Sequence, residues 1–492
     1  MNRIKNFIKS ELAALKGGVS LPEYITWWLV RLAMIGAIIY HSLKGEDGFV
    51  IVMMEMNLLA TFSIPLAHLL FPRRLLLGSA PFRVQSCINI FVFAGSFLGH
   101  GLGFNWKVYN YDKILHVVSG FICVFIAALL IDAIRDGRSS GALFKTLASS
   151  GFSFLVMVAW EVFEFFSDYY IAGSNNQNYL WEPKSDMLFF KIFGVGVDNK
   201  AQYPVLDTNI DLLCAVIGCI AADIVLFILL YRRDRKSGVK SAERSRITVK
   251  EHFKAQLSAL RAQIHPAEYV FWWLLRLFMV GGMIYLSVTK PGTYLIKLMF
   301  LNSLAMYAVP LLRFIDVKEL LFAKVPYRVQ SHVSVMVFFG SFLGHAMNLY
   351  LPYPNYDKFL HVVSGAVAVL VGMELARAFC KKPLSVQMNM FFAQGFSFSV
   401  MVLWELVEFF SDFYIPGSRN QSYDYVPRAD FLFFKIFGTG KGDPLQYPVF
   451  DTNIDLLCAI VGSLLAGIAV FAAAEIIRRR KGSEKKAALA VS

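Results

Sequence analysis

The stretch DTNIDLLCAVIGCIAADIVLFILLY (residues 207–231) decides the fold, and its counterpart is DTNIDLLCAIVGSLLAGIAVFAAAE (residues 451–475). Each copy begins with two aspartates and continues as an apolar segment long enough to cross a hydrocarbon core, which takes about 20 residues. Because lipid offers no partner for backbone polar groups, such a segment pairs them internally as a helix. The stretch therefore predicts a transmembrane helix with acidic groups at one end, present twice.

Apolar segments of this kind occur along the whole chain. Of its 492 residues, 57% are hydrophobic and 17% are charged, and the mean hydropathy is +0.53. A soluble domain is about 25% charged, since its surface faces water. The segments lie near residues 24–42, 49–71, 82–104, 113–133, 143–169 and 208–231, and near 269–287, 294–314, 327–349, 358–379, 387–413 and 452–477. The sequence therefore predicts an all-α polytopic membrane protein with 12 transmembrane helices.

The second set of six segments repeats the first. His116 and His361 are 245 positions apart, as are Arg31 and Arg276, and after one deletion near residue 380 the offset becomes 244. An even number of spans gives both copies the same orientation, related by an axis along the membrane normal. We expect two parallel six-helix repeats, which form a pseudo-dimer within one chain.

A short amphipathic segment precedes each repeat. In the first, an apolar stripe at helical spacing lies beside lysines, which is typical of a helix in the membrane surface. Its members are Ile4, Phe7, Ile8, Leu12 and Leu15. The expected domains are a first repeat over 1–235, a basic cytoplasmic linker over 236–248, a second repeat over 249–480 and a basic cytoplasmic tail over 481–492.

The formal net charge of +13 is concentrated beside the membrane segments. Residues 232–250 hold eight Lys/Arg against two acids, and residues 478–486 hold six against one. Basic residues that flank transmembrane helices mark the cytoplasmic side. The charge therefore indicates the lipid bilayer and not nucleic acid as partner. We expect a bacterial cytoplasmic (inner) membrane protein whose N- and C-termini are both cytoplasmic. The six cysteines fall within or at the ends of apolar helices, where we interpret them as packing residues.

Four polar blocks persist in both repeats, whereas other polar residues have diverged; Glu55, for example, is matched by Phe300. The blocks are Gly-Ser-Phe-Leu-Gly-His (95–100, 340–345), Asn-Tyr-Asp-Lys-x-Leu-His (110–116, 355–361), Trp-Glu-x-x-Glu-Phe-Phe-Ser-Asp (160–168, 404–412) and Asp-Thr-Asn-Ile-Asp (207–211, 451–455). Residues one turn apart share a helix face, so the acidic and histidine side chains within a block point the same way. With the expected topology, all four blocks lie at the extracytoplasmic ends of their helices.

A histidine beside several carboxylates, with no thiol, suits a hard or borderline divalent ion such as Zn, Mn, Mg or Fe. His116, Glu161 and Glu164 are candidate ligands, with Asp211 and His100 binding directly or supporting them. The residues assigned as metal ligands are His116, His361, His100, His345, Asp112 and Asp357. The carboxylates assigned to catalysis are Glu161, Glu164, Asp211, Glu405, Glu408 and Asp455. The accessory residues are Trp160, Trp404, Asp168, Asp412, Asp207, Asp451, Arg31 and Arg276. Without a metal, such carboxylates share protons and act as an acid–base pair.

Structural interpretations compete with these roles. Asp112 and Asp207 precede helices and can cap them, and Asp211 can favour the positive helix end. His100 and its counterpart can be hydrogen-bonded interface residues, and Trp160 and its counterpart can belong to an aromatic belt.

A structural role accounts for the charged lysine and arginine side chains within the membrane segments, but not for the glutamates. Lys113 and Lys358 either neutralise the cluster or, in the favoured interpretation, are boundary lysines that extend toward water. Arg31 does the same from inside the first helix, or pairs with an acid or a lipid phosphate. Glu161 lies about 10 Å deeper than Asp168 at about 1.5 Å per residue. An unpaired carboxylate there costs at least about 2.5–3.5 kcal/mol, so the glutamates indicate a function.

The outer loop between the fifth and sixth helices retains an aromatic piece, Phe-Phe-Lys-Ile-Phe-Gly, at 189–194 and 433–438. Two interpretations remain open for this piece. It forms a lid over the polar cluster, or it rests on lipid headgroups.

The motifs Tyr-Asp-Lys-x-x-His, Trp-Glu-x-x-Glu and Asp-Thr-x-x-Asp, in this order, resemble the YjdF-like family of uncharacterised bacterial inner-membrane proteins. The Asp-Lys-x-x-His element is also similar, more weakly, to VanZ-like membrane proteins. The resemblance covers helices three to six of each half, and this chain departs from the family pattern by carrying two units. It supports a membrane protein and implies no reaction.

Two functions follow as hypotheses. One is an intramembrane metal-dependent hydrolase or transferase that acts on a lipid or lipid-linked envelope substrate, with a glutamate as base. The other is a proton- or cation-coupled transporter built from two pseudo-symmetric halves. A non-catalytic scaffold or sensor explains the loop but not the buried glutamates.

Overall fold

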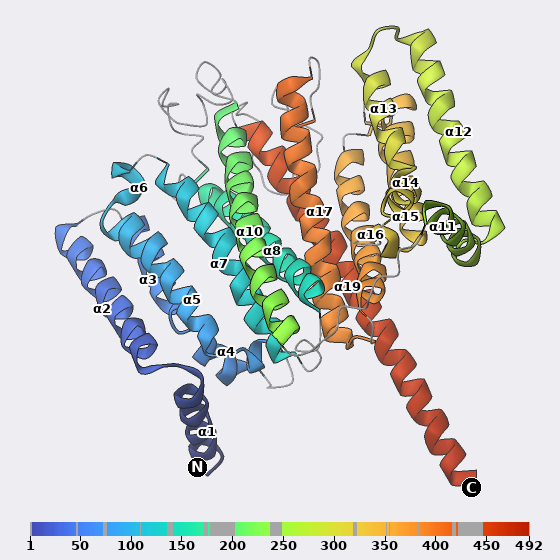
Figure 1. Cartoon of the computed structure of the whole chain (residues 1–492). Helices are drawn as coiled ribbons and strands as arrows, with labels where there is room; N and C mark the ends of the chain where they lie inside the picture. Colours follow the sequence, from blue (N-terminus) through green and yellow to red (C-terminus); the bar gives the residue numbers. More distant parts are fainter. Residues whose placement is uncertain are drawn as a thin grey trace. The chain divides into compact units, whose positions relative to one another are not determined.

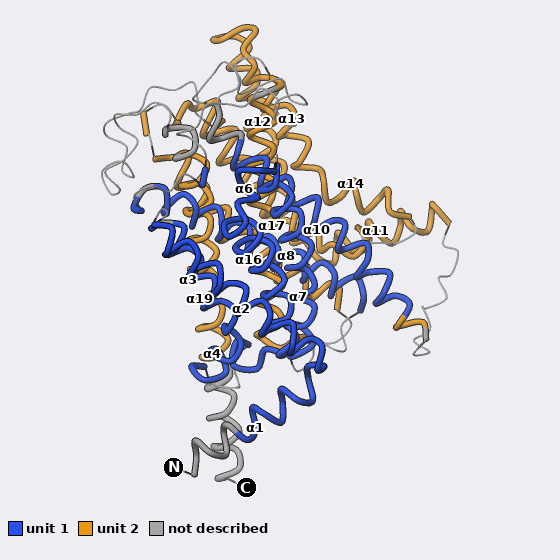
Figure 2. Tube along the Cα trace, turned by 90° about the vertical axis from the view of Figure 1, so that its left-hand side faces the viewer, with its two compact units in different colours: residues 1–232 blue, residues 233–492 orange. Residues whose placement is uncertain are grey.

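The computed structural model describes residues 2–45, 48–71, 76–108, 110–134, 141–171, 176–177, 202–236, 248–317, 322–350, 352–353, 355–380, 383–415, 420–421 and 446–491. The chain divides into two compact units, Met1–Arg232 and Arg233–Ser492, which Figure 2 colours separately. Every regular element in the described residues is a helix (Figure 1). The prediction of an all-α membrane protein is thus confirmed in its fold class. The linker and the aromatic loop pieces at 189–194 and 433–438 lie almost wholly outside the described residues.

The helices of the first unit follow the predicted order. They are α1 (Asn2–Gly18), α2 (Leu21–Lys44), α3 (Gly48–Ala60), α4 (Ser63–Leu70), η1 (Leu77–Ser79), α5 (Arg83–Val92), the π-helix η2 (Phe93–Gly101), α6 (Phe104–Lys107), α7 (Tyr111–Ala133), α8 (Ala142–Tyr170) and α10 (Gln202–Lys236).

The second unit repeats this order. Its helices are α11 (Val249–Gln263), α12 (Pro266–Thr289), α13 (Tyr294–Ala305), α14 (Ala308–Ile315), η4 (Phe322–Lys324), α15 (Arg328–Val337), the π-helix η5 (Phe338–Ala346), α16 (Tyr356–Phe379), α17 (Val386–Tyr414) and α19 (Gln446–Val491). Residues 481–491 of the predicted tail over 481–492 thus continue α19.

Eight described helices are long and apolar enough to cross a membrane, and the number rises to 10 if each of two bent pairs counts as one span. The bent pairs are the predicted spans 49–71 and 294–314. Each is broken into two helices, with bends of 61° between α3 and α4 and 53° between α13 and α14. The predicted third spans are also not plain α-helices, because α5 and α15 continue directly into the π-helices η2 and η5.

Arg31 binds the backbone at the break between α3 and α4. Its Nη2 donates to the Thr61 carbonyl oxygen at 2.5 Å, and its guanidinium lies 3.9 Å from the centre of the Phe62 ring. A helix end leaves carbonyls without partners, and a cation there is favourable. The expectation that Arg31 reaches water, an acid or a lipid phosphate was therefore wrong, since it is buried against a backbone carbonyl. Arg276 does the same at Met306, at 2.6 Å.

Glycines bring two site-bearing helices, α7 and α10, into backbone contact. A Cβ added at Gly120 would lie 2.2 Å from the Ala215 carbonyl oxygen, and one at Gly218 would lie 1.9 Å from that of Val117. Small residues allow membrane helices this close approach. It places the outer ends of α7 and α10, which carry the retained aspartates, side by side.

The two amphipathic segments are helices, α1 and α11, that dock by polar contacts. Glu11 of α1 lies 2.7 Å from the Nδ1 of His68. In α11, Gln256 accepts a hydrogen bond of 2.9 Å from Arg313, and His252 is buried against the Arg313 carbonyl. These contacts attach each helix to its own unit; a location in the membrane surface stays a prediction.

Candidate metal centre

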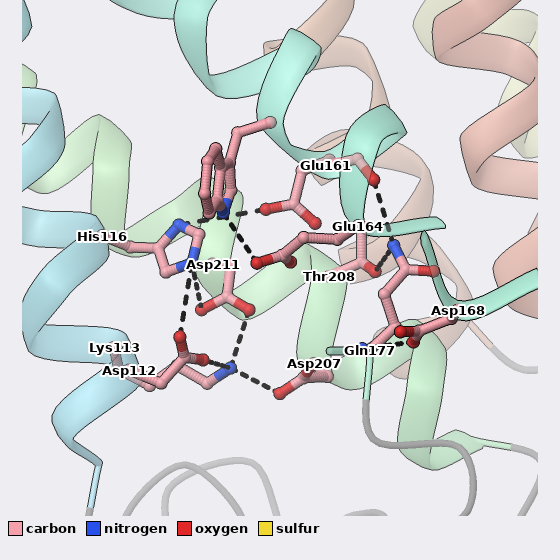
Figure 3. A network of polar contacts seen from close by, with 11 residues as sticks. Asp112, Lys113, His116, Glu161, Glu164, Asp168, Gln177, Asp207, Thr208 and Asp211 are labelled. Carbon is pink, nitrogen blue, oxygen red and sulfur yellow. Dashed lines mark hydrogen bonds and ion pairs between the residues drawn. The ribbon is translucent and has the colours of Figure 1, made fainter. Parts of the chain in front are cut away.

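The N-terminal ends of α7 and α10 and the C-terminal end of α8 bring the retained polar residues of the first unit together (Figure 3). Helix α7 contributes a histidine from its second turn, and α8 contributes two glutamates from its last turns. Helix α10 contributes two aspartates from its second and third turns. The labelled members of the cluster are Asp112, Lys113, His116, Glu161, Glu164, Asp168, Gln177, Asp207, Thr208 and Asp211.

One ring nitrogen of His116 faces two aspartates. Its Nε2 lies 3.6 Å from the Oδ1 of Asp112 and 3.6 Å from the Oδ1 of Asp211. These separations are too long for hydrogen bonds. They are close to the distance of about 3.4 Å between neighbouring ligands of a tetrahedral ion with bonds of about 2.1 Å. Within the described residues, the Oδ1 of Asp211 is buried without a hydrogen-bond partner. The three atoms therefore fit a divalent cation placed between them.

The other ring nitrogen of His116 faces the glutamates. Its Nδ1 lies 3.9 Å from the Oε1 of Glu161, and His116, Glu161 and Glu164 together offer three ligand atoms within 4.8 Å of one another. Trp160 donates a hydrogen bond of 2.6 Å to the Oε1 of Glu164. Trp160 is therefore in contact with the cluster through Glu164, and the belt interpretation does not account for it.

Lys113 is bound inside the cluster, so the interpretation as a boundary lysine that extends toward water was wrong. Its side chain is 4% exposed. Its Nζ donates to Asp207 at 2.5 Å, to Asp211 at 2.8 Å and to Asp112 at 3.0 Å. Lys113 contacts the Oδ2 atoms of Asp112 and Asp211, while their Oδ1 atoms face His116. The lysine therefore fixes how both carboxylates present their remaining oxygens.

Asp207 does not cap a helix. Helix α10 begins at Gln202, five positions earlier, so Asp207 lies in its second turn. Asp112 lies in the first turn of α7, where its carboxylate contacts Lys113 and His116. The capping interpretation is wrong for Asp207, and the side-chain contacts of Asp112 are those of the cluster.

Asp168 fastens a short piece of the outer loop to the end of α8. Its carboxylate accepts hydrogen bonds from the backbone N–H groups of Asn176 at 2.7 Å and Gln177 at 2.8 Å. The Gln177 side chain then donates to the Glu161 carbonyl oxygen and to Thr208 at 3.2 Å. This strap, residues 176–177, links α8 to α10 over the cluster.

His100 and His345 lie outside both ligand groups that the described residues form. The His100 ring packs edge-on against Trp106, with 6.0 Å between ring centres, and the His345 ring lies 5.0 Å from that of Tyr350. Their assignment as metal ligands stays a prediction.

The second unit builds the same cluster from α16, α17 and α19. Lys358 donates to Asp451 at 2.5 Å and to Asp455 at 2.6 Å. His361 lies 3.6 Å from Asp455, 3.8 Å from Asp357 and 3.9 Å from Glu405. Trp404 donates to Glu408 at 2.7 Å, and Asp412 accepts from Asn420 and Gln421. Two units of one chain thus reach the same arrangement.

Sequence reasoning favoured the wrong role for one residue pair and missed the role of another. Lys113 and Lys358 persist inside an Asp-Lys-x-x-His block, and their retention was the available signal. Gln177 and Gln421 persist within a retained Asn-Gln dipeptide of the outer loop. Nothing in the spacing indicates that this dipeptide folds back onto the helix end.

The chain matches one family model twice, at residues 26–233 and 269–475, and that family is described as a predicted membrane protein (DUF2238). No curated protein and no solved structure matches the chain. The two matches cover most of the sequence and correspond to the two repeats, which confirms the resemblance to a YjdF-like family in tandem duplication. The chain therefore belongs to the DUF2238 family of membrane proteins and carries its domain twice.

Proposed function

We propose that each repeat holds a divalent cation and uses it as a metal-dependent hydrolase or transferase on a lipid or lipid-linked envelope substrate. The ligands are Asp112, His116 and Asp211 in the first repeat, and their counterparts Asp357, His361 and Asp455 in the second. The observation that carries this proposal is the spacing of 3.6 Å from the His116 Nε2 to each aspartate oxygen. No hydrogen bond joins these atoms, and a cation between them accounts for the gap.

The substrate class follows from a proposed topology. Eight helices, two bent pairs and the two helices that continue into π-helices make twelve spans. The basic residues at 232–250 and 478–486 support cytoplasmic termini, and we propose the bacterial inner membrane as the location. The cluster then lies at the outer ends of its helices, at the depth where lipid headgroups meet hydrocarbon. A substrate anchored in that leaflet reaches it without leaving the membrane.

The residues around the cation have distinct tasks. A bound divalent cation activates water or polarises a phosphoryl or acyl oxygen. Lys113 holds Asp112 and Asp211 in position, and Glu161, whose Oε2 is buried without a hydrogen-bond partner in the described residues, accepts a proton. Trp160 orients Glu164 beside it.

The test is elemental analysis of the purified full-length protein, followed by lipid analysis of cells. Asp211→Asn together with Asp455→Asn should remove the ion bound by the two aspartates in each repeat and change the cellular lipid profile. Glu55→Gln is the matched control, because Glu55 is exposed and its counterpart is Phe300. Wild-type protein that binds no divalent metal, or a folded double variant that keeps its metal, would contradict the proposal.

Transport is the second candidate, and one observation favours it. In the first repeat Asp223 lies far along α10 from the cluster and accepts a hydrogen bond of 2.6 Å from Ser150, which adds a carboxylate toward the cytoplasmic end. Its counterpart in the second repeat is Gly467. Proton or cation flux in proteoliposomes that Asp223→Asn abolishes would favour transport; flux-free vesicles would exclude it.

A further inference from the structure

We infer that each repeat holds a second divalent cation, bound by the opposite nitrogen of the same histidine. His116 Nδ1, Glu161 and Glu164 are its ligands in the first repeat, and His361, Glu405 and Glu408 in the second. This inference rests on the proposed function, since it adds a cation to the same site, and it makes Glu161 a ligand in place of a proton acceptor. It turns the centre into a pair of cations bridged by one imidazole ring.

The first support is the orientation of the ring. The Nε2 of His116 faces Asp112 and Asp211, and its Nδ1 faces Glu161 at 3.9 Å. A distance of 3.9 Å is too long for a hydrogen bond. Neither nitrogen therefore has a hydrogen-bond partner among these three carboxylates. The two ligand groups share only the histidine, and each brings its ligand atoms within 4.8 Å of one another.

The second support is an oxygen without a partner. Glu161 is 1% exposed, and its Oε2 has no hydrogen-bond partner in the described part of the chain. The same holds for the Oε2 of Glu405, which is also 1% exposed. A carboxylate in the hydrocarbon region is costly unless it is paired or bound to a metal. Both repeats keep this arrangement, so an accident of one unit does not explain it.

The third support is the charge of the cluster. Five carboxylates surround a single buried cation, Lys113, in each repeat. They are Asp112, Glu161, Glu164, Asp207 and Asp211. In their ionised form they leave an excess of four negative charges. One divalent cation cancels two of these charges. The remaining two are cancelled by a second cation or by protons on the glutamates, and a metal count distinguishes the two.

The bridge has a chemical consequence. Cations on opposite nitrogens of one ring, with bonds of about 2.0–2.1 Å, lie about 6 Å apart. That is wider than the separation of about 3.5–4 Å at which two metals clamp one phosphoryl group. At this wider separation the two cations would not clamp one phosphoryl group together; each would polarise an oxygen of the substrate or of water by itself. The second cation replaces the proton of the ring, so its binding releases one proton per repeat.

Metal counting of the full-length protein with Mn²⁺ or Zn²⁺ tests the inference. Wild type should hold four ions per chain. Glu161→Gln with Glu164→Gln, combined with the same changes at Glu405 and Glu408, should leave two. The Gln side chain at position 164 keeps an acceptor for Trp160. Glu161→Gln alone should leave three ions per chain, and this single variant tests the inference even if the quadruple variant does not fold. Titration calorimetry in buffers of different ionisation enthalpy counts the protons that are released as metal binds. Binding of the second cation in each repeat should release one proton per ion.

The outcomes separate this inference from the proposed function. Two ions in wild type that the glutamate changes do not affect would overturn the second cation and leave the first. Loss of every ion from the folded glutamate variant would overturn the inference, since it would mean one cation that depends on both ligand groups. No ion in wild type would overturn both proposals.

Discussion

The two repeats agree at their outer ends and differ in the middle of their helices. At the outer end the distance from histidine to the deep glutamate is 3.9 Å in both, and the distance from lysine to the first aspartate of α10 or α19 is 2.5 Å in both. The distance from histidine to the α7 or α16 aspartate is 3.6 Å in one and 3.8 Å in the other. The polar cluster is therefore kept as a whole, which is the behaviour of a site and not of packing.

The middle of the helices follows a different rule. In the first repeat Ser150 binds Asp223. The second repeat has the larger Gln394 facing Gly467, where a Cβ would lie 2.4 Å from the glutamine Nε2. The larger side chain lies on α10 in the first repeat and on α17 in the second, and the space between the two helices is filled in both. The two repeats therefore keep close packing at this position but do not keep the carboxylate.

The turn after each π-helix is a third region, in which the backbone conformation is the same in both repeats but a neighbouring side chain differs. The turn after each π-helix has a left-handed residue, Gly103 in one repeat and Asn348 in the other. Two positions later, Asn105 of the first repeat is replaced by Tyr350, and a Cβ at Gly344 would lie 2.2 Å from the Tyr350 ring. Burial, and then the charges of Asp357 and Glu408, raises the pKa of Tyr350 well above its usual range. The centre is the same in both repeats, and the residue beside it differs.

The largest expected effect tests the agreement at the outer ends. Lys113→Met removes the ammonium group that contacts Asp112 and the buried Asp207 and Asp211 in the metal-free cluster, which should destabilise the protein by about 3–5 kcal/mol. Lys358→Met should have the same effect, because its contacts match. Denaturant unfolding in detergent measures both, with Lys107→Met as the exposed control. Effects that differ several-fold between the two variants would break the equivalence of the repeats.

A smaller effect is expected where α7 meets α10. Gly120→Ala forces a methyl group into the Ala215 carbonyl and should cost about 1–3 kcal/mol. Because the helices move apart, metal content should fall as well. Gly365→Ala repeats the test in the second unit, where the Cβ would lie 2.3 Å from the Ala459 carbonyl oxygen. Gly36→Ala is the control, since nothing lies within 4 Å of its added Cβ. Unchanged stability and metal content in both variants would show that the close approach does not hold the cluster together.

The sequence predicted the features of this fold that follow from residue spacing, namely shared helix faces and the internal repeat. Residue spacing placed Asp112 and His116 on one face, and the offset of 245 identified the repeat. It did not predict which backbone group meets which side chain. The break at Thr61 is bound by Arg31 of a neighbouring helix. No residue next to Thr61 in the sequence indicates a break. Apolar composition alone describes residues 49–71 as one span.

The buried lysine shows the same limit. A lysine at a helix end reaches water in most membrane helices, so the local pattern favoured exposure. Its burial depends on Asp207 and Asp211, which lie on another helix almost a hundred positions away. Retention in both repeats was a signal for importance, but it does not distinguish a buried ion pair from an exposed anchor.

The strap gives a further prediction of moderate size. Gln177→Ala removes the side chain that reaches the Glu161 carbonyl and Thr208, which should cost about 1 kcal/mol. The outer loop should become more accessible to protease near residue 177, while the metal content stays at the wild-type level. Gln421→Ala should behave alike. Loss of metal in either variant would mean that the strap belongs to the centre itself.

The smallest effect concerns the position where the repeats differ. Tyr350→Phe removes a hydroxyl that donates to the Gly340 carbonyl oxygen at 3.3 Å, at a cost of about 0.5 kcal/mol. A raised pKa in the folded state keeps the proton on Tyr350 after the unfolded chain has lost it. Its contribution is therefore complete below about pH 10 and declines as the pH rises beyond that value. Tyr350→Phe should flatten the loss of stability above pH 10, whereas Asn105→Ala should leave that slope unchanged, because an asparagine does not titrate. An unchanged slope in Tyr350→Phe would mean that its phenol titrates as it does in water, and the two repeats would then differ in shape but not in charge.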